Sequence, residues 1–155
     1  GEARSRGIEF DLAYGLSENL LINLSSSYVD AELTIDAPRV NGSKGDRLPG
    51  SANVNVSLGV EYQFMVASYD AYLRTDYAYV GGFYNNLKEE GLEAGDYNKF
   101  NIKLGVRIDQ FDVDLYVDNL TNEDNLTWVD SEGFVVDRGN RLRPRTIGFN
   151  VGYQF

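Results

Sequence analysis

The sequence predicts an all-β protein, a segment of an antiparallel transmembrane β-barrel with about seven meandering strands. Three observations predict this fold class: apolar and polar residues alternate, short and long connections alternate, and aromatic residues gather near the ends of the alternating runs. Alternation with a period of two is the pattern of a strand with one apolar face. Short periplasmic turns at one end and long extracellular loops at the other are typical of outer-membrane barrels.

The alternation is clearest in residues 53–64, 100–109 and 146–155, where an apolar side chain stands at every second position. At 43% hydrophobic residues, a ten-residue alternation of one phase arises by chance in about one window in a thousand. Three such segments in one chain are therefore not accidental. With the weaker runs included, the predicted strands are 3–14, 20–34, 51–64, 68–83, 96–109, 111–129 and 142–155.

The positions of the connections and of the aromatic residues predict where the strands end. Short connections fall at 15–19, 65–67 and 109–110, and long polar ones at 35–50, 84–95 and 130–141. The interval from Tyr69 to Tyr79 corresponds to about 33 Å of strand, or about 25 Å when tilted, which is the height of a barrel's apolar band. The predicted membrane-facing and girdle residues are Tyr62, Phe64, Tyr69, Tyr79, Ile147, Phe149, Val151, Tyr153 and Phe155.

Composition excludes several functions. The net charge is -10 and no basic stripe exists, which argues against nucleic acid as a partner. The chain contains neither Cys nor His, so the common nucleophilic triads and thiolate metal sites are ruled out, and we predict no catalytic residue, metal or cofactor. Asp112, Asp114 and Asp118 share the polar face of one predicted strand, and we expect ion pairs with Lys103 and Arg107.

An odd number of antiparallel strands cannot close on itself with antiparallel pairing, and an open edge in lipid leaves costly unpaired backbone groups. No apolar signal segment opens the chain at Gly1, so we expect a fragment whose further barrel strands precede it. Two alternatives stay open. One is a small complete barrel with a structural or adhesive role, which an ordered seam near Ile8 and Phe149 would favour. The other is a soluble β-sandwich binding module with an inward apolar face.

Several segments resemble TonB-dependent outer-membrane receptors. Residues 142–149 together with the ending Tyr153-Gln154-Phe155 resemble the last strand of that family. Residues 111–122, FDVDLYVDNLTN, are similar to its penultimate strand, in which an aliphatic-Asn-Leu-Thr-Asn stretch recurs. Residues 5–33 resemble a strand-turn-strand of the family, and 45–50 the junction that follows. The resemblance covers nearly the whole chain, but the family's plug domain, TonB box and most of its barrel have no counterpart.

The resemblance implies that residues 1–155 are the C-terminal barrel portion of a receptor in the cell outer membrane. Such receptors take up a scarce ligand (siderophore-iron, cobalamin or carbohydrate) and are coupled to TonB. The implied partners are outer-membrane lipid, the TonB complex through the missing plug domain, and the outer-membrane assembly machinery through the C-terminal Phe155.

No family-wide binding motif falls in this stretch, so ligand contacts are predicted only from residue types in the long loops. Aromatic residues there could stack on an aromatic siderophore or a sugar face, and arginines could pair with carboxylates. Against each stands the plain alternative of a girdle aromatic or a solvated charge. The predicted ligand-binding residues are Arg47, Phe83, Tyr84, Tyr97, Trp128, Arg138 and Arg141, with Arg143 as a further candidate.

Overall fold

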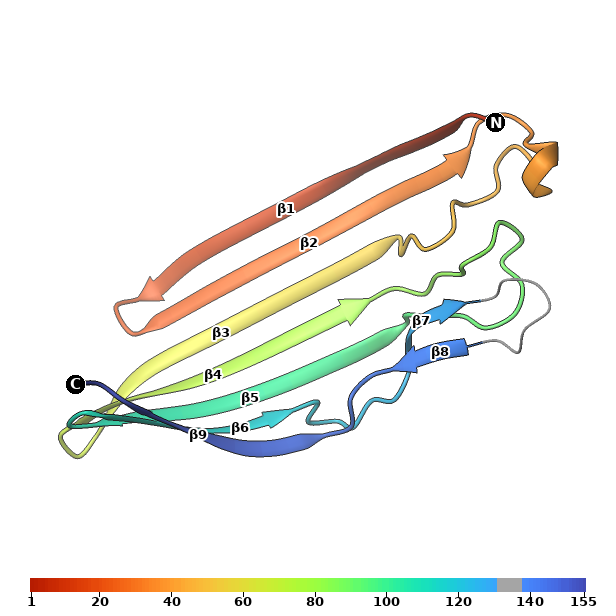
Figure 1. Cartoon of the computed structure of the whole chain (residues 1–155). Helices are drawn as coiled ribbons and strands as arrows, with labels where there is room; N and C mark the ends of the chain where they lie inside the picture. The colour runs from red at the N-terminus through yellow and green to blue at the C-terminus, as the bar shows by residue number, and fades with distance from the viewer. Residues whose placement is uncertain (131–137) are drawn as a thin grey trace.

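The computed structural model describes residues 1–130 and 138–155, and its main feature is one curved sheet of seven antiparallel strands (Figure 1). The order in the sheet is β1-β2-β3-β4-β5-β6-β9, so the predicted antiparallel meander is confirmed. Part of one predicted long loop, residues 131–137, lies outside the described residues. The strands of the sheet are β1 (Ala3–Ser17), β2 (Leu20–Leu33), β3 (Val54–Val66), β4 (Tyr69–Val80), β5 (Tyr97–Ile108), β6 (Phe111–Asp118) and β9 (Thr146–Tyr153).

The connections are sorted by length between the two ends of the sheet. Tight turns join β1 to β2, β3 to β4 and β5 to β6 at one end, while the long connections emerge at the other (Figure 1). A short 3-10 helix, η1 (Pro38–Val40), lies in the first long loop. Within residues 1–130 and 138–155, no helix is long and apolar enough to cross a membrane.

The strand register places the apolar residues of all seven strands on one face. In one row across β1 to β5, Leu12 pairs with Leu24, which pairs with Leu58, then Tyr77, then Phe100. On the same face, Leu104 of β5 pairs with Leu115 of β6, which pairs with Phe149 of β9. Because side chains alternate between faces along each strand, one such row fixes the faces of the rest. The predicted sharing of one apolar face by the seven strands is therefore confirmed by the pairing.

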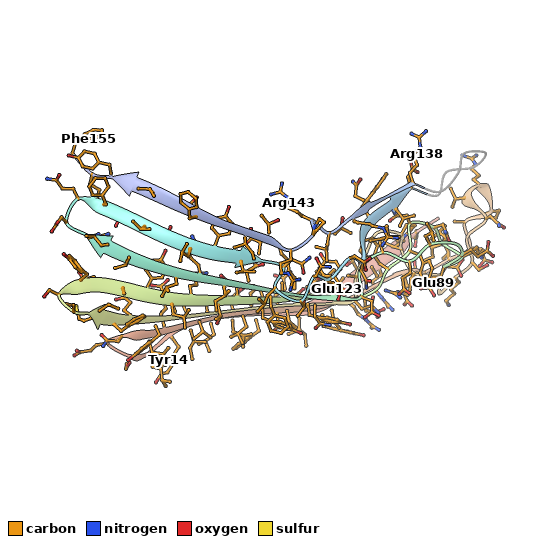
Figure 2. The ribbon with its side chains drawn as sticks, turned by 90° about the horizontal axis from the view of Figure 1, so that it is seen from below. Tyr14, Glu89, Glu123, Arg138, Arg143 and Phe155 are labelled. Atoms are coloured by element: carbon orange, nitrogen blue, oxygen red, sulfur yellow. The ribbon has the colours of Figure 1, made fainter. Side chains whose placement is uncertain are left out.

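This apolar face is exposed and lies on the outer side of the curve. Tyr14 near one edge of the sheet and Phe155 beyond the other point away from each other (Figure 2). Ile8 is 74% exposed and Ile147 is 76% exposed. Among the described residues no second layer covers the sheet, and most of the few buried side chains, such as Val129, lie at the long-loop end. A dry centre between two sheets, as in a β-sandwich, is not found there.

The predicted strand 111–129 is wrong as a single strand. β6 ends at Asp118, because Asn119 adopts a left-handed backbone with a φ of 51° and Asn122 does the same at 57°. The chain then forms a separate hairpin of β7 (Leu126–Asp130) and β8 (Arg138–Arg141), the second of which falls where a loop was predicted. Thr146 is consequently the first residue of β9, four residues later than predicted.

The sheet is open. β1 and β9 are its two edges, and in the described part of the chain neither pairs with the other. The seam near Ile8 and Phe149 that would favour a small complete barrel is therefore not present in that part.

Candidate functional site

The inner, polar face of the sheet carries ion pairs between neighbouring strands. Arg107 on β5 donates from Nε to Oδ1 of Asp112 on β6 at 2.9 Å, and Gln154 donates to the second oxygen of Asp112 at 2.7 Å. Lys103 lies 4.0 Å from Asp114. The predicted pairing of these carboxylates with Lys103 and Arg107 is confirmed for Asp112 and Asp114.

One contact on this face spans three strands. The hydroxyl of Tyr72 on β4 donates to Asp114 on β6 at 2.9 Å, and it passes over Gly105 of the intervening β5. Side chains of strands that are not neighbours can meet on the inside of a curved sheet and diverge on the outside. The bridge therefore marks the polar face as concave, in agreement with the outward directions of Tyr14 and Phe155 (Figure 2).

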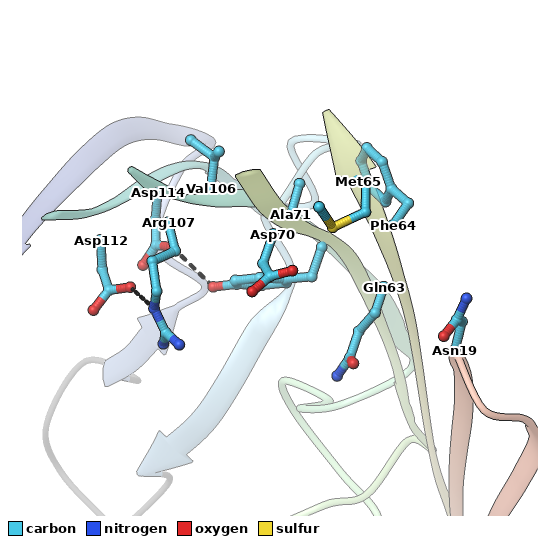
Figure 3. A pocket seen from close by; sticks show the side chains of 11 residues that line it. Asn19, Gln63, Phe64, Met65, Asp70, Ala71, Val106, Arg107, Asp112 and Asp114 are labelled. Carbon is cyan, nitrogen blue, oxygen red and sulfur yellow. Dashed lines mark hydrogen bonds and ion pairs between the residues drawn. The ribbon is translucent and has the colours of Figure 1, made fainter. Parts of the chain in front are cut away.

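A hollow of about 590 Å³ opens on this concave face near the short turns (Figure 3). It combines the Tyr72–Asp114 and Arg107–Asp112 contacts with the amide of Gln63. These groups offer both donors and acceptors of hydrogen bonds. The hollow is thus suited to water, to a polar solute or to a polar protein segment.

The long-loop end is held together by contacts between loops 34–53 and 81–96. Lys88 Nζ lies 2.8 Å from Oδ2 of Asp46, and Arg47 lies 3.1 Å from Glu89. The hydrogen bonds that Asp46 accepts from Lys88 and from the backbone N–H of Ser43 hold the pKa of this carboxyl below its ordinary value.

The second of these loops is in turn bonded to the segment that leads into the hairpin. The N–H of Gly95 donates to the carbonyl of Leu126 at 2.8 Å, and Asn125 donates to the carbonyl of Asp96 at 2.7 Å. Three connections far apart in sequence therefore form one linked structure above the sheet.

Toward the long loops, the outer face changes from apolar to polar. The rings of Tyr77 and Phe100 pack at a tilt of 45° with their centres 4.8 Å apart, and the Tyr77 hydroxyl donates to Asn98 at 2.7 Å. Farther along β1, on the face of Ile8, Arg4 pairs with Glu32 and Arg6 with Asp30. The apolar surface is thus bounded by amphipathic rings and then by charge.

At the short-turn end, aromatic rings bound the same face. Phe111 and Tyr153 lie 5.1 Å apart between ring centres, Tyr153 and Phe155 lie 6.0 Å apart, and Tyr62 stacks on Phe64 at 5.8 Å. On the outer face, aromatic rings therefore lie at the short-turn end and, at Tyr77 and Phe100, also toward the long loops.

In the described residues, no group of three or more His, Cys, Asp or Glu side chains is placed to hold a metal ion. The chemistry that the described side chains offer is hydrogen bonding, ion pairing and apolar contact.

The family described as "TonB dependent receptor-like, beta-barrel" matches residues 1–120 of this chain. This chain belongs to that family. The resemblance read from the sequence motifs is therefore confirmed, and the curved sheet is a part of a TonB-dependent receptor barrel. Comparison with curated protein sequences gave no match.

Two solved structures share the fold of this receptor segment. The ferric yersiniabactin uptake receptor FyuA from Yersinia pestis superposes with a TM-score of 0.83 at 19% identity, over 96% of this chain and 23% of FyuA. BauA, the ferric preacinetobactin receptor from Acinetobacter baumannii, gives 0.77 at 22% identity, over 99% of this chain and 22% of BauA. The receptor segment thus spans less than a quarter of the length of either protein.

The residues predicted to bind ligand all lie at the long-loop end of the receptor segment, but in different settings. Arg47 is partly buried, and besides Glu89 it donates to Asn53 at 2.8 Å, so its guanidinium is already engaged. Arg141 pairs loosely with Asp124 at 3.5 Å. The half-buried aromatic residues are Phe83, Tyr84 and Tyr97, and the exposed residues are Trp128, Arg138 and Arg143.

The structure brings some of these residues together. Loop 81–96, which carries Phe83 and Tyr84, is bonded both to Gly50 of the first loop and to β7, which carries Trp128. Arg138 lies on β8, on the far side of the hairpin from this junction (Figure 2). The aromatic candidates are therefore linked through the backbone of one loop, whereas Arg138 stands apart.

The predicted girdle residues lie on the outer face as the register requires. Phe149 is 70% exposed, and the others range from half-buried to fully exposed. Sequence reasoning missed Asn119, which is only 1% exposed and whose side chain binds the backbone at two distant points. Its signal in the sequence was the Asn-Leu-Thr-Asn stretch, which gave a resemblance but no physical role.

Proposed function

We propose that this chain forms part of the barrel wall of a receptor in a cell outer membrane, with the convex face in lipid and the concave face toward a wet lumen. One observation carries the proposal: the exposed face of seven paired strands is apolar, and the opposite face is polar and ion-paired. Soluble monomers rarely expose an apolar patch of more than a few hundred Å². In a membrane barrel this arrangement is the stable one, because apolar side chains alternate with lumen-facing polar ones.

We also propose that the receptor captures its ligand at the long-loop end and that the ligand is an iron-siderophore complex. Both neighbouring structures are named as receptors of ferric compounds, which favours this class over cobalamin or carbohydrate. The predicted contacts are the aromatic residues Phe83, Tyr84, Tyr97 and Trp128 together with Arg138 and Arg141. Coupling of uptake to TonB would be made by a plug domain outside residues 1–155. Residues 1–155 would be the C-terminal portion of the barrel.

The open edges of the sheet support a larger barrel. β1 and β9 each present backbone groups that the described residues leave unpaired along one side, and each such group costs several kcal/mol in lipid. In a bilayer these edges therefore need further strands of the receptor. We propose that Phe155, fully exposed at the end of the outer face, is presented to the outer-membrane assembly machinery.

The membrane assignment is tested by refolding the chain in detergent and in plain buffer. We expect strand circular dichroism and migration that changes on heating only in the detergent sample. A sharp cooperative unfolding transition in buffer alone would overturn the assignment, because it requires an apolar centre that water does not reach.

The ligand class is tested with the intrinsic fluorescence of Trp128, the one Trp of the chain. Trp128 lies on β7 and is 46% exposed, so a ferric complex bound at the loops should quench its emission. The chain in detergent is titrated with a ferric hydroxamate, a ferric catecholate, cobalamin and a maltooligosaccharide. Saturable quenching by a ferric complex, weakened in Tyr84→Ala, supports the proposal, whereas a response to the sugar alone contradicts the siderophore class.

A further inference from the structure

A basic segment interrupts the acidic character of this chain just before β9. Four arginines fall within eight residues, 138–145, in a protein whose net charge is -10. Arg138, Arg141, Arg143 and Arg145 are all exposed. Arg143 points to the same side of the ribbon as Phe155, which is the convex side (Figure 2).

The position of Arg143 and Arg145 relative to the apolar face is the second observation. They precede Ile147 and Phe149, two of the most exposed apolar side chains of the sheet, at intervals of two residues. A fully extended chain spans at most about 3.5 Å per residue, so the backbones of the two arginines lie at most about 7 Å apart and within about 14 Å of Ile147. They therefore mark the end of the exposed apolar surface along β9.

Three other arginines of the outer face and the hairpin already have carboxylate partners. Arg4 and Arg6 share the outer face of β1 with Ile8, and each lies within 3.0 Å of a carboxylate on β2. Arg141 has Asp124. No acidic side chain among the described residues pairs with Arg143 or Arg145.

The guanidinium of Arg145 is nevertheless held in place. One of its nitrogens donates to the carbonyl of Leu120 at 3.3 Å, and its backbone N–H donates to Asn122 at 3.0 Å. A guanidinium has five donors in a fixed fork, so four remain for a ligand. Such a fork matches the geometry of a phosphate oxygen pair better than an ammonium does.

We infer that Arg143 and Arg145 form a binding site for the phosphate headgroup of a membrane lipid, whose acyl chains lie along Ile147 and Phe149. The inference rests on the proposed membrane orientation. An amphiphile with an anionic head fits this surface. Its head would meet positive charge without a carboxylate partner and the fixed guanidinium of Arg145, and its tails would meet the exposed apolar surface. A soluble anion would use the arginines but not the apolar residues below them.

The test uses the chain in neutral detergent micelles and measures energy transfer from Trp128 to lipids labelled with dansyl in the acyl chain. Phosphatidic acid, a glucuronosyl diacylglycerol and a galactosyl diacylglycerol share tails and differ in the head. We expect the tightest binding for phosphatidic acid, weakened by salt. Inorganic phosphate at the same concentration should compete poorly.

The paired variant R143Q/R145Q should weaken phosphatidic acid binding by about 30-fold, since each basic residue near an anionic surface contributes about fivefold. R143K/R145K keeps the charge and should lose only part of the affinity. The matched control R4Q/R6Q removes the same charge from the same face and end of the sheet but should leave binding within about twofold, because those arginines already have carboxylate partners.

Equal losses in R143Q/R145Q and R4Q/R6Q would overturn the inference, because they would show a general charge effect. Equal binding of the three headgroups, or full competition by inorganic phosphate, would also overturn it. Strand circular dichroism and heat-dependent migration are recorded for every variant. If the unmodified chain unfolds cooperatively in plain buffer, the proposed membrane function fails. If it assembles in micelles without headgroup preference, only the lipid site fails.

Discussion

Asn119 joins three parts of the chain, and its replacement gives the sharpest test of how the β6–β9 connection is held. Its side-chain amide donates to the carbonyl of Glu123 at 2.7 Å and to that of Arg143 at 2.8 Å. Its side-chain oxygen accepts from the N–H of Glu123 at 2.9 Å. The residue is 1% exposed and left-handed, with a φ of 51°. One side chain thereby ends β6, shapes the turn and positions the segment that leads into β9.

We predict that Asn119→Ala lowers the free energy of unfolding by about 3–4 kcal/mol. Three backbone groups lose their partners, and each buried unsatisfied group costs about 1–3 kcal/mol. Because Glu123 and Arg143 lie near solvent, water can replace part of the loss, and we take about 1 kcal/mol for each group. The left-handed backbone adds about 1 kcal/mol for Ala, whereas Asn tolerates it.

Asn119→Asp separates these contributions. Asp keeps the shape, the acceptor for the N–H of Glu123 and a tolerance for left-handed φ, but it cannot donate to the two carbonyls. The predicted loss is at least about 2 kcal/mol from the two donated bonds, because the carboxylate oxygen is also repelled by the two carbonyl oxygens. The control is Thr121→Ala, an exposed change in the same turn, which should stay within about 0.5 kcal/mol.

The assay is urea unfolding of the chain in detergent, followed by the fluorescence of Trp128, with strand circular dichroism as a second probe. If Asn119→Asp unfolds at the same urea concentration as the unmodified chain, the two donated bonds carry no stability and the reasoning is refuted. A loss in Thr121→Ala equal to that of Asn119→Ala would refute it too, because any change in the turn would then suffice.

Two further predictions concern the concave face and the loops. Gly105→Ala places a methyl group against the ring of Tyr72 and close to Oδ1 of Asp114, so the bridge should break at a cost of about 1–2 kcal/mol in urea unfolding. The pKa of Asp46 lies below its ordinary 3.8, so its stabilising contribution is fully present above that pH and is lost as the pH falls through the lower folded value. Carbon-detected NMR should place its titration below 3.8 and show it rising toward 3.8 in Lys88→Met; an unchanged midpoint would contradict the cause given.

The strands and their faces could be predicted because period-two alternation is a local signal. The pairing of strands then places the apolar residues of neighbouring strands on the same face. Apolar and polar residues alternate strictly from Val54 to Phe64. A slip of one residue in the pairing with the neighbouring strands would place the apolar residues on opposite faces. The strand ends at the short turns were also predicted correctly. Asp109, for example, adopts a left-handed φ of 52° in the tight turn before β6. Strand ends in the long loops were less accurate, and Val54 begins β3 three residues later than predicted.

The break after β6 was not predicted from the sequence, and tertiary contacts help to fix its position. Leu126 to Val129 are good strand formers, but the phase of the alternation changes after β6. The apolar residues of β6 stand at odd positions, whereas Leu120, Leu126 and Trp128 stand at even positions. Asn119 stabilises the break, because its side-chain amide donates a hydrogen bond to the carbonyl of Arg143, 24 residues away. The change of phase and the Asn- and Asp-rich stretch 118–125 are local signals of a break, but they do not show where the chain goes next.

The candidate site was predicted by residue type and not by geometry. The long loops were correctly identified as one end of the molecule, but loop sequence does not show which charges are neutralised. Arg47 was a candidate for an anionic ligand, yet the structure gives it Glu89 and Asn53 as partners. Arg143, with no carboxylate beside it in the described residues, was the weaker candidate on sequence grounds.

The glycines of the strands show why this sheet can curve with its polar side inward. Large polar side chains on the concave face cross the neighbouring strand, where a glycine leaves room: Tyr72 lies over Gly105 and Tyr116 lies against Gly148. At Gly59 the side chains of Arg74 and Asp76 take the same space. All three glycines fall on the polar positions of the alternation, where side chains converge. An apolar core on the concave side would need large side chains at these positions. The glycines and the outward apolar face therefore both follow from the direction in which the sheet curves.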